Sequence, residues 1–368
     1  MMPKRLKTFS IPPFSGGDSS MRTWLMPVGI TAFSDGEGLY PLAGGPFGFT
    51  HLDVFMDDSL NLTVTRIAAN RLIDHVPDQH HEAALAALGR LTSTRADFAQ
   101  LSMGEAQVMG ILNTTPDSFS DGGDHLMSDK AIQSGLDMAE AGASILDIGG
   151  ESTRPGAEPV GHDEECRRIL PVIEALTKQG YVVSADTRHT DVMTAALDHG
   201  ATIINDVGGL RDKGAVELVS ARQAPVMIMH MQGEPGTMQK DPHYRFAPLD
   251  IYDWLETRIK ACVDAGLPRA LIAVDPGFGF GKTPHHNMQI IAHLALFHGL
   301  GVPIVLGVSR KSTIAHFARG EAAKDRMPAS VALAALGRGQ GVQIFRVHDV
   351  AETTQALANA EVLLRSRS

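Results

Sequence analysis

Short apolar segments recur at regular intervals from residue 107 to the end of the chain. They are rich in β-branched residues and lack a clean alternation of apolar and polar positions, as expected of parallel strands that are buried on both faces. Stretches with the period of an α-helix separate them. The eight segments are Val108–Asn113, Ile145–Gly150, Val182–Thr187, Thr202–Val207, Val226–His230, Leu271–Asp275, Ile304–Ser309 and Ile344–His348.

Eight strand–helix units in this region predict an α/β fold, a (β/α)8 TIM barrel, whose usual length is ~250 residues. The alternative is a doubly wound open sheet. Within the first unit, Ser128 is expected to cap a helix that ends at Gly142. In a barrel, the carboxyl ends of the strands form one rim, where the active site lies. Polar residues cluster at the carboxyl ends of the eight segments, namely Asn113, Glu151, Asp186, Asn205, His230, Asp275, Ser309 and His348.

The chain before this region has a different pattern. It predicts two strands, Leu52–Phe55 and Leu62–Arg66, and a helix, Gln79–Leu91, with one apolar face. So few regular elements predict a small hydrophobic core, so we expect this region to be stabilised by packing on the rest of the protein. We therefore divide the chain into an N-terminal extension of unknown role, residues 1–104, and the barrel, residues 105–368.

The composition narrows the possible partners and the compartment. Lys and Arg total 32 against 42 Asp and Glu, a formal charge of −10, which argues against nucleic acid or an anionic membrane as the main partner. Two cysteines, Cys166 and Cys262, exclude a disulfide scaffold and show no metal-ligand spacing. Residues 1–10 are basic but lack the apolar stretch of a secretory signal, and no apolar run approaches ~18 residues. A soluble, cytoplasmic protein is expected.

Two loops that follow strands carry candidate chemistry. In Asn113–Gly123, small hydroxyl, amide and carboxylate groups suit a loop that closes on an anion and a metal, with the Asn113 carbonyl oxygen as a ligand. In Gly149–Gly156, Arg154 suits a bidentate contact with a phosphate or carboxylate. A simple Pro/Gly turn and a solvated arginine are the respective alternatives.

Other strand ends suggest a heterocycle and a diphosphate as ligands. Asp186 and the pair Asn205–Asp206 suit the N–H and C=O edge of a heterocycle, although such groups also satisfy turns. Arg346 and His348 lie two apart on the eighth strand and point to one side. A closed barrel places that strand beside Asn113, so these donors and a metal ligand predict a diphosphate site, while a purely structural His348 is the alternative.

The segment Asp275–Thr283 resembles a nucleotide-binding motif but does not match one. A P-loop would need glycine six residues before Lys282, where Pro276 stands, and the glycine spacing also differs from the dinucleotide fingerprint. We expect instead a flexible loop that brings Phe280 beside a planar ligand.

Taken together, residues 109–123, 147–156, 275–282, 309–311 and 346–348 resemble the dihydropteroate synthases, in the order of that family and over about residues 107 to 360. Thr114 departs from the family, which usually has an aliphatic residue there. The resemblance implies condensation of 6-hydroxymethyl-7,8-dihydropterin diphosphate with 4-aminobenzoate, with loss of diphosphate before the amine attacks. It also implies Mg²⁺ as cofactor and a homodimer.

The resemblance further implies a role for each matching residue. Asp186, Asn205, Asp275 and Lys311 would bind the pterin. Asn113 would bind Mg²⁺ and, with Arg346 and His348, the diphosphate. Thr153, Arg154, Pro155, Phe119, Phe280 and Ser312 would surround the aminobenzoate. Arg346, His348 and Lys311, with Asp117 and Asp121 of the first loop, would be the catalytic residues.

Two other functions remain possible from the sequence. A pterin-binding methyltransferase that uses a folate and a corrinoid would share the pterin residues but would not need Lys311, Arg346 and His348 for a diphosphate. A catalytically silent pterin-binding paralogue would not need the polar residues that this sequence retains, namely Asn113, Arg154, Lys311, Arg346 and His348.

Overall fold

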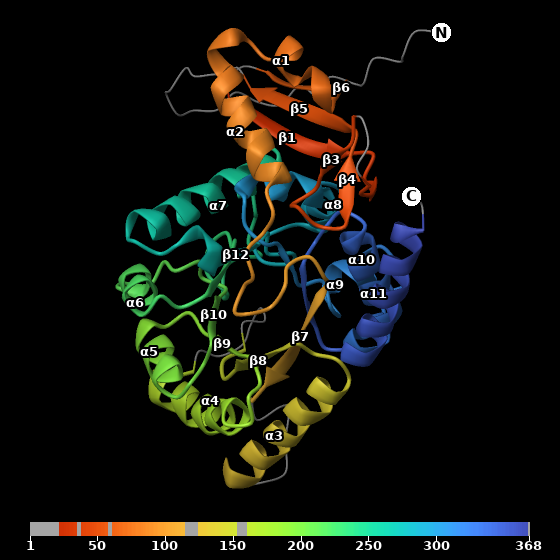
Figure 1. Cartoon of the computed structure of the whole chain (residues 1–368). Helices are drawn as coiled ribbons and strands as arrows, with labels where there is room; N and C mark the ends of the chain where they lie inside the picture. The colour runs from red at the N-terminus through yellow and green to blue at the C-terminus, as the bar shows by residue number, and fades with distance from the viewer. Residues whose placement is uncertain (1–21, 35–37, 58–60, 115–123, 153–159, 367–368) are drawn as a thin grey trace.

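The computed structural model describes residues 22–34, 38–57, 61–114, 124–152 and 160–366. Its central feature is an eight-stranded parallel sheet in the order β12-β11-β10-β9-β8-β7-β14-β13 (Figure 1). The strands are β7 (Gln107–Asn113), β8 (Ile145–Gly149), β9 (Val183–Asp186), β10 (Ile203–Asp206), β11 (Val226–Met229), β12 (Ile272–Asp275), β13 (Val305–Leu306) and β14 (Ile344–Val347).

The sheet closes into a barrel. The backbone N–H of Val274 in β12 donates to the Pro303 carbonyl at 2.9 Å, and Val274 forms a parallel bridge with Ile304, next to β13. On the other side of β13, β14 pairs with β7, with Val347 opposite Gly110. The prediction of a (β/α)8 barrel is therefore confirmed, and the open sheet is excluded.

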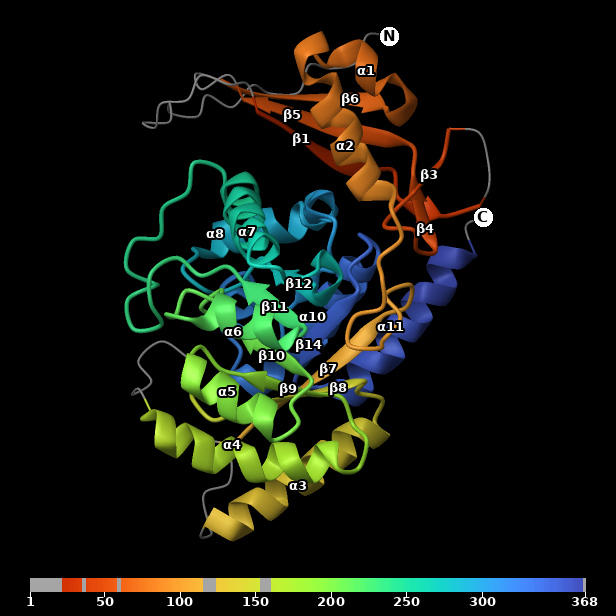
Figure 2. The ribbon, with the colours of Figure 1, turned by 60° about the vertical axis from the view of Figure 1, so that its left-hand side comes forward.

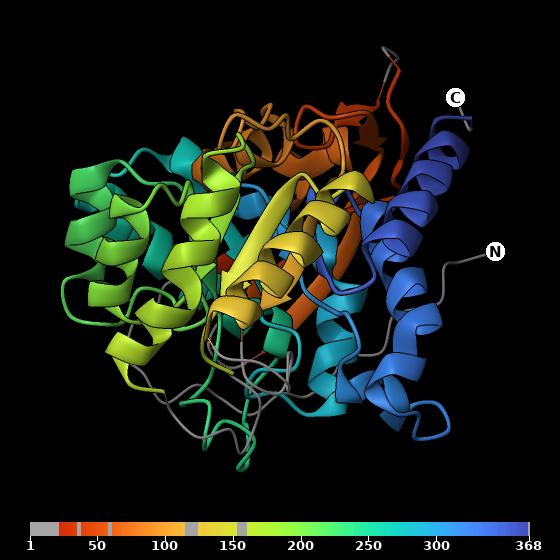
Figure 3. The ribbon, with the colours of Figure 1, turned by 90° about the horizontal axis from the view of Figure 1, so that it is seen from below.

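Helices alternate with the strands and surround them (Figures 2 and 3). An apolar stripe of the longer helices is buried in the core; in α4, Ile169, Val172, Ile173 and Leu176 are fully buried. None of the helices in the described ranges is both long and apolar enough to span a membrane. The helices are α3 (Asp124–Glu140), α4 (His162–Thr177), α5 (Thr190–Asp198), α6 (Ala215–Arg222), α7 (Ala247–Asp264), α8 (Pro284–Ala292), α9 (Ser312–His316), α10 (Met327–Arg338) and α11 (Val350–Arg365).

The prediction of a helix cap at Ser128 is wrong. Helix α3 begins four residues earlier, at Asp124, so that Ser128 lies within it. A serine followed by a helical pattern marks a possible start, but it does not exclude an extra turn before it. Gly142, which has a φ of +104°, follows the helix as expected.

The N-terminal region contains more structure than the sequence suggests. Strands β5 (His51–Asp57) and β6 (Leu62–Ala68) and helix α2 (His81–Thr92) confirm the predicted elements. Strand β1 (Arg22–Val28) pairs with β5 at the edge of a three-stranded antiparallel sheet. It contains Pro27, a residue that argues against a central strand but fits an edge. The smaller elements are β2 (Thr31–Ala32), β3 (Tyr40–Pro41), β4 (Phe47–Phe49) and α1 (Leu72–His75).

This region has its own core and also packs on the barrel. Leu25 joins an internal cluster with Phe47 and Phe49, so the core is larger than expected. The residues on either side of it in β1, Trp24 and Met26, instead join the core of the barrel, because successive strand residues face opposite sides. The expected dependence on the barrel is thus seen on one face of the sheet, which lies above α7 in Figure 1.

Residues just before β7 close the amino-terminal end of the barrel. Phe98, Ala99 and Met103 are buried in one cluster with interior residues of seven strands. Phe98 is fully buried, and its backbone pairs with that of Leu101 in both directions, at 3.0 and 2.9 Å. The interior residues of this cluster are Met109, Ile145, Ile203, Met227, Ala273, Val305 and Ile344.

We predict that Phe98→Ala lowers the free energy of unfolding by about 3–5 kcal/mol, because it leaves a cavity where seven strands meet. Urea unfolding followed by circular dichroism measures this change. The matched control is Phe317→Ala, at a side chain that is 55% exposed, with an expected loss below about 1 kcal/mol. Equal losses for the two variants would show that Phe98 does not support the barrel.

Candidate active site

An arginine and two carboxylates form the centre of the polar interior. Arg346 of β14 donates from Nε to Asp147 Oδ2 of β8 and from an Nη to Asp186 Oδ2 of β9, both at 2.6 Å. Asp147 is fully buried, and only 18% of the arginine side chain is exposed. One positive charge therefore serves two negative ones, and these three residues carry a net charge of −1 when all are ionised.

Asp147 of β8 also binds the side chain of Asn205, two strands away on β10. The side-chain amide of Asn205, on β10, donates to both Asp147 oxygens, at 3.2 and 3.3 Å. Asp147 thus orients two of the predicted site residues, although it was not predicted as one itself. The available signal was its position, since it is a carboxylate inside a strand whose neighbours, Leu146 and Ile148, are apolar and buried.

The shared arginine leaves Asp186 with an unusual acidity. Burial raises the pKa of Asp186 to about 7; the Arg346 charge opposes this rise, and the Asp147 charge adds to it. The pKa of Arg346 is raised, because the two carboxylates outweigh the effect of its burial. At neutral pH, Asp186 is therefore close to its titration midpoint while Arg346 stays charged.

A second pair of predicted residues, Asp275 and Lys311, lies next to these groups. A Cβ atom at Gly307 would lie 3.5 Å from Asp275 Oδ2, 3.8 Å from Lys311 Nζ and 3.9 Å from Arg346 Cβ, so the three side chains converge around this glycine. Burial raises the pKa of Asp275, against the opposing charge of Lys311. Burial lowers the pKa of Lys311 to about 8, against the attraction of Asp275.

Lys311 also contacts an aromatic ring of the loop after β12. Its Nζ donates to the Phe278 carbonyl and lies 4.5 Å from the ring centroid of Phe280. The sequence predicts that Phe280 lies beside a planar ligand. In the structure its ring lies against the Lys311 ammonium group, at the edge of the cluster of polar side chains. An aromatic face next to a buried donor suits a flat, polar molecule.

The glycine-rich loop after β12 is shaped by its own packing. A Cβ at Gly277 would lie 1.9 Å from the His230 carbonyl oxygen and one at Gly281 2.5 Å from that of Gln232, and both glycines have positive φ. Lys282 is buried, and its Nζ lies 2.9 Å from His230 Nδ1. Lys282, which stands at the lysine position of the P-loop motif that we excluded, thus has a partner within the protein. The loop was expected to be flexible, but it packs tightly against the residues that follow β11.

His348 and Ser312 lie at the same rim as these groups. The His348 backbone N–H donates to Ser309 Oγ at 3.1 Å, and its ring Nδ1 lies 3.0 Å from the same oxygen. Ser312 is exposed at the first position of α9. Asn113 ends β7, the strand that pairs with the one carrying Arg346.

The sequence also assigns residues of two loops to the aminobenzoate and to catalysis. The residues concerned lie outside the described ranges, so their assignments stay predictions. They are Asp117, Phe119, Asp121, Thr153, Arg154 and Pro155.

Two polar residues at strand ends serve mainly to hold the structure. Asp206 accepts hydrogen bonds from the backbone N–H groups of Gly208 and Leu210, at 2.5 and 2.6 Å. Its carboxylate therefore stabilises a turn, which was the alternative to contact with a heterocycle. Glu151 accepts two bonds from Arg188, at 3.0 and 3.2 Å. Burial alone would raise the pKa of Glu151, but hydrogen bonds from His189 and Arg188 lower it to about 2.

Glu151, Glu165 and His189 form the one group of three ligand-type side chains found in the described part of the chain, with ligand atoms within 4.8 Å of one another. The Arg188 charge, bonded to Glu151, opposes a cation there. The group therefore fits an ion-pair network better than a metal centre.

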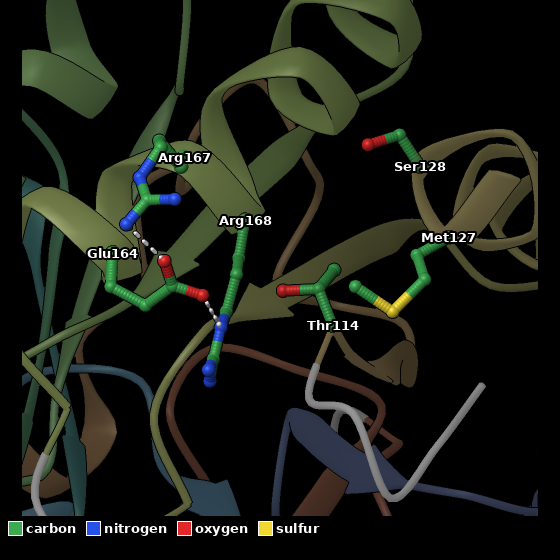
Figure 4. Close-up of a pocket in the computed structure, with 6 residues that line it drawn as sticks. All are labelled: Thr114, Met127, Ser128, Glu164, Arg167 and Arg168. Atoms are coloured by element: carbon green, nitrogen blue, oxygen red, sulfur yellow. Dashed lines mark hydrogen bonds and ion pairs between the residues drawn. The ribbon is translucent and has the colours of Figure 1, made fainter. Parts of the chain in front are cut away.

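A small cavity next to the first loop is also filled by internal contacts (Figure 4). It measures about 20 Å³, enough for about one water molecule, and lies between α3, α4 and the end of β7. Arg168 points into this area but donates to Glu164 at 2.8 Å and to the Gly150 carbonyl at 2.9 Å. Thr114 Oγ1 donates to the Gly149 carbonyl at 3.1 Å, so its departure from the usual aliphatic residue is accommodated.

Comparisons with known proteins agree with this geometry. Residues 109–348 match the family described as pterin binding enzyme. The chain is 42% identical over 274 residues to the dihydropteroate synthase of Escherichia coli K12, an alignment that covers 73% of this chain and 97% of that enzyme.

Solved structures give the same result. The dihydropteroate synthase of Xanthomonas albilineans with 4-aminobenzoic acid matches with a TM-score of 0.69 and 44% identity, covering 73% of this chain and 97% of that one. The same enzyme in complex with 7,8-dihydropteroate matches with a TM-score of 0.66 and 42% identity, covering 72% and 95%.

The acidity of Asp186 predicts a pH-dependent stability. Its pKa rises from about 4 in the unfolded chain to about 7 in the folded protein, so that the folded state holds an extra proton between these values. This contribution is complete below about pH 4 and is lost as the pH rises through 7. The thermal midpoint of the parent, relative to that of Asp186→Asn, should therefore fall between pH 4 and 7. Parallel profiles would contradict the shift, and Gln133→Ala, an exposed uncharged site, controls for substitution alone.

Proposed function

We infer the activity from one premise: the chain belongs to the pterin binding enzyme family and, within it, to the dihydropteroate synthases. It is a transferase that condenses 6-hydroxymethyl-7,8-dihydropterin diphosphate with 4-aminobenzoate to give 7,8-dihydropteroate and diphosphate, a step of folate biosynthesis. The observation that carries this conclusion is the buried group of Asp147, Asp186 and Arg346, which meets Asp275 and Lys311 at the carboxyl end of the barrel.

We propose that the pterin ring binds to the strand ends. Asp186, Asn205 and Asp275 present carboxylate and amide groups in a buried space, where each hydrogen bond to a ring N–H or C=O is protected from water. Lys311 adds a donor whose position is fixed by the Phe278 carbonyl. The internal hydrogen bonds of Asp186 and Asp275 leave carboxylate lone pairs that a polar heterocycle can use.

We propose that Arg346 and His348 act on the diphosphate as it leaves. Arg346 uses Nε and one Nη for the carboxylates, which leaves donors of its planar fork for an anion. The bond between the methylene carbon and the diphosphate oxygen breaks with its electron pair on the diphosphate, the 4-aminobenzoate nitrogen bonds to the resulting methylene cation, and this nitrogen then loses a proton to solvent. The nearby carboxylates favour this cation, and no protein nucleophile is needed.

The aminobenzoate is assigned to the outer part of the site. Phe280, whose ring centroid lies 4.5 Å from Lys311 Nζ, and Ser312, at the start of α9, are the proposed members that lie in the described ranges. Thr153, Arg154, Pro155 and Phe119 complete the proposed set, and Asp117 and Asp121 remain proposed members of the catalytic first loop. These assignments rest on the sequence resemblance alone.

The exposed apolar residues of the last two helices support a homodimer. Leu336, on α10, and Val362 and Leu363, on α11, are each more than half exposed. The Arg338–Glu361 ion pair at 3.0 Å joins the two helices, so the three exposed side chains lie on neighbouring helices. Sedimentation of a Leu363→Glu variant tests the proposal, and an unchanged dimer would exclude this face. A cytoplasmic location is proposed from the sequence and from the folate route.

Arg346→Ala should separate a synthase from a pterin-binding methyltransferase or a silent paralogue. Loss of a charge-assisted donor that faces a leaving anion costs ~2–4 kcal/mol in the barrier, about 30- to 1000-fold in turnover. Arg346→Lys should recover part of it, because lysine keeps the charge without the planar fork. The measurement is diphosphate release with and without 4-aminobenzoate.

The matched control is Arg222→Ala, which removes an exposed arginine paired with Asp198 and should leave the rate unchanged. A parental rate for Arg346→Ala would refute the diphosphate contact. Diphosphate release that does not depend on 4-aminobenzoate in the parent would count against the synthase reaction itself.

We propose that Asn113 binds Mg²⁺ only together with the diphosphate. Its amide oxygen suits a hard cation, but one neutral ligand makes a weak site. When bound, Mg²⁺ would offset negative charge on the leaving group. Chelator should therefore abolish activity and added Mg²⁺ should restore it, while calorimetry detects little Mg²⁺ binding to the protein alone. Tight stoichiometric binding without substrate would contradict this assignment.

A further inference from the structure

A cavity of about 350 Å³ lies between the N-terminal region and the barrel. One wall comes from the last turn of α2 and the residues after it, 90–96, and the other from residues just before β12 and β13. It therefore lies at the amino-terminal ends of these strands, opposite the rim that carries the proposed active site. Three of its lining residues are arginines, Arg90, Arg95 and Arg269.

The three arginines converge on the end of one short helix, η5 (Leu294–Leu300). Each donates to a different one of the last three carbonyl groups of η5, with Arg95 at 2.8 Å and Arg90 at 2.6 Å. Arg95 also donates to the carbonyls of Arg90 and Ser93, at 2.9 and 2.8 Å. The pairs at the helix end are Arg95 with His298, Arg90 with Gly299 and Arg269 with Leu300.

Carbonyl groups satisfy these donors but do not neutralise their charge. The end of a helix carries only about half a negative charge, against three positive ones. Within the described residues, no carboxylate lies within 4.0 Å of any of the three guanidinium groups. Glu256 is the carboxylate whose charge acts on Arg269, and it lies 3.8 Å from Arg22.

The charge of Arg95 is the most costly of the three, because only 7% of the residue is exposed. Burial, and then the charge of Arg269, lower the pKa of Arg95 to about 10. Its Nε is buried without a hydrogen-bond partner. The arginine thus remains charged at neutral pH beside two others, in a place where an anion would relieve their repulsion.

Donors remain available for such an anion. A guanidinium group has five N–H donors; Arg269 uses one on η5, and Arg90 contacts η5 and the Tyr252 hydroxyl. The volume falls within the range of pockets for small molecules, ~300–1,000 Å³. Planar guanidinium groups favour phosphate oxygens, which they bind with two parallel hydrogen bonds.

We propose that this cavity binds a small molecule through a phosphate or diphosphate group, held by Arg90, Arg95 and Arg269. The ligand would join the N-terminal region to the barrel, because the arginines come from both. The site is separate from the diphosphate contact of Arg346 and does not depend on the proposed function.

The test is calorimetric titration of the full chain with inorganic phosphate, with inorganic diphosphate and with citrate. Diphosphate should bind at two sites in the parent. Arg269→Ala should weaken one of them by about 10- to 100-fold, since a charge-assisted donor is lost, and Arg346→Ala should weaken the other. Arg71→Ala, which removes an exposed arginine paired with Asp74, is the matched control and should change neither.

Three results would overturn the proposal. Parental affinity at both sites in Arg269→Ala would mean that the arginines only cap η5, and so would a single site that Arg346→Ala abolishes. Citrate binding as tightly as diphosphate in the cavity would exclude phosphate as the recognised group. Arg269 is exposed, so its variant should fold, which circular dichroism checks; Arg269→Lys keeps the charge and should retain part of the affinity.

Discussion

The site depends on one arginine that is shared by two buried carboxylates. Arg346 is held by Asp147 and Asp186, and each of these would be a costly buried charge without it. The three residues come from β14, β8 and β9, and β14 reaches the other two because the last strand of the sheet pairs with the first, β7. Asn205 takes its orientation from the same Asp147. Barrel closure and the polar interior therefore stabilise each other.

The proposed site is divided between rigid strands and the loops that follow them. The groups proposed to read the pterin, such as Asp186 and Asp275, are fixed by buried neighbours. The groups proposed for the aminobenzoate come largely from the segments after β7 and β8. Strand ends hold polar groups with the precision that recognition of a heterocycle requires. Loops vary without disturbing a barrel, so the proposed division would give the two substrates to parts of the chain with different structural constraints.

The sequence predicts the barrel well because buried parallel strands are continuous apolar segments that end in polar residues. It does not reveal β1, because Pro27 is permitted only by an edge position that depends on pairing with β5. The role of Asp147 was missed because its partners, Asn205 and Arg346, lie 58 and 199 residues further along the chain. The polar residues at strand ends could thus be predicted from the sequence. The sharing of the Arg346 charge between Asp147 and Asp186 could not, because it depends on contacts between distant parts of the chain.

The position of the N-terminal region has a consequence for the order of events during synthesis. Arg22 bonds to Asp253, 231 residues later, and Arg95 bonds to the His298 carbonyl, 203 residues later. This region is translated before the barrel, and the barrel residues to which it bonds follow more than 200 residues later. Contacts of such long sequence separation form slowly, since a large loop must close before they do. Trp24 and Met26 therefore stay uncovered while most of the barrel is translated, which makes this interval the one in which the nascent chain is most exposed to aggregation.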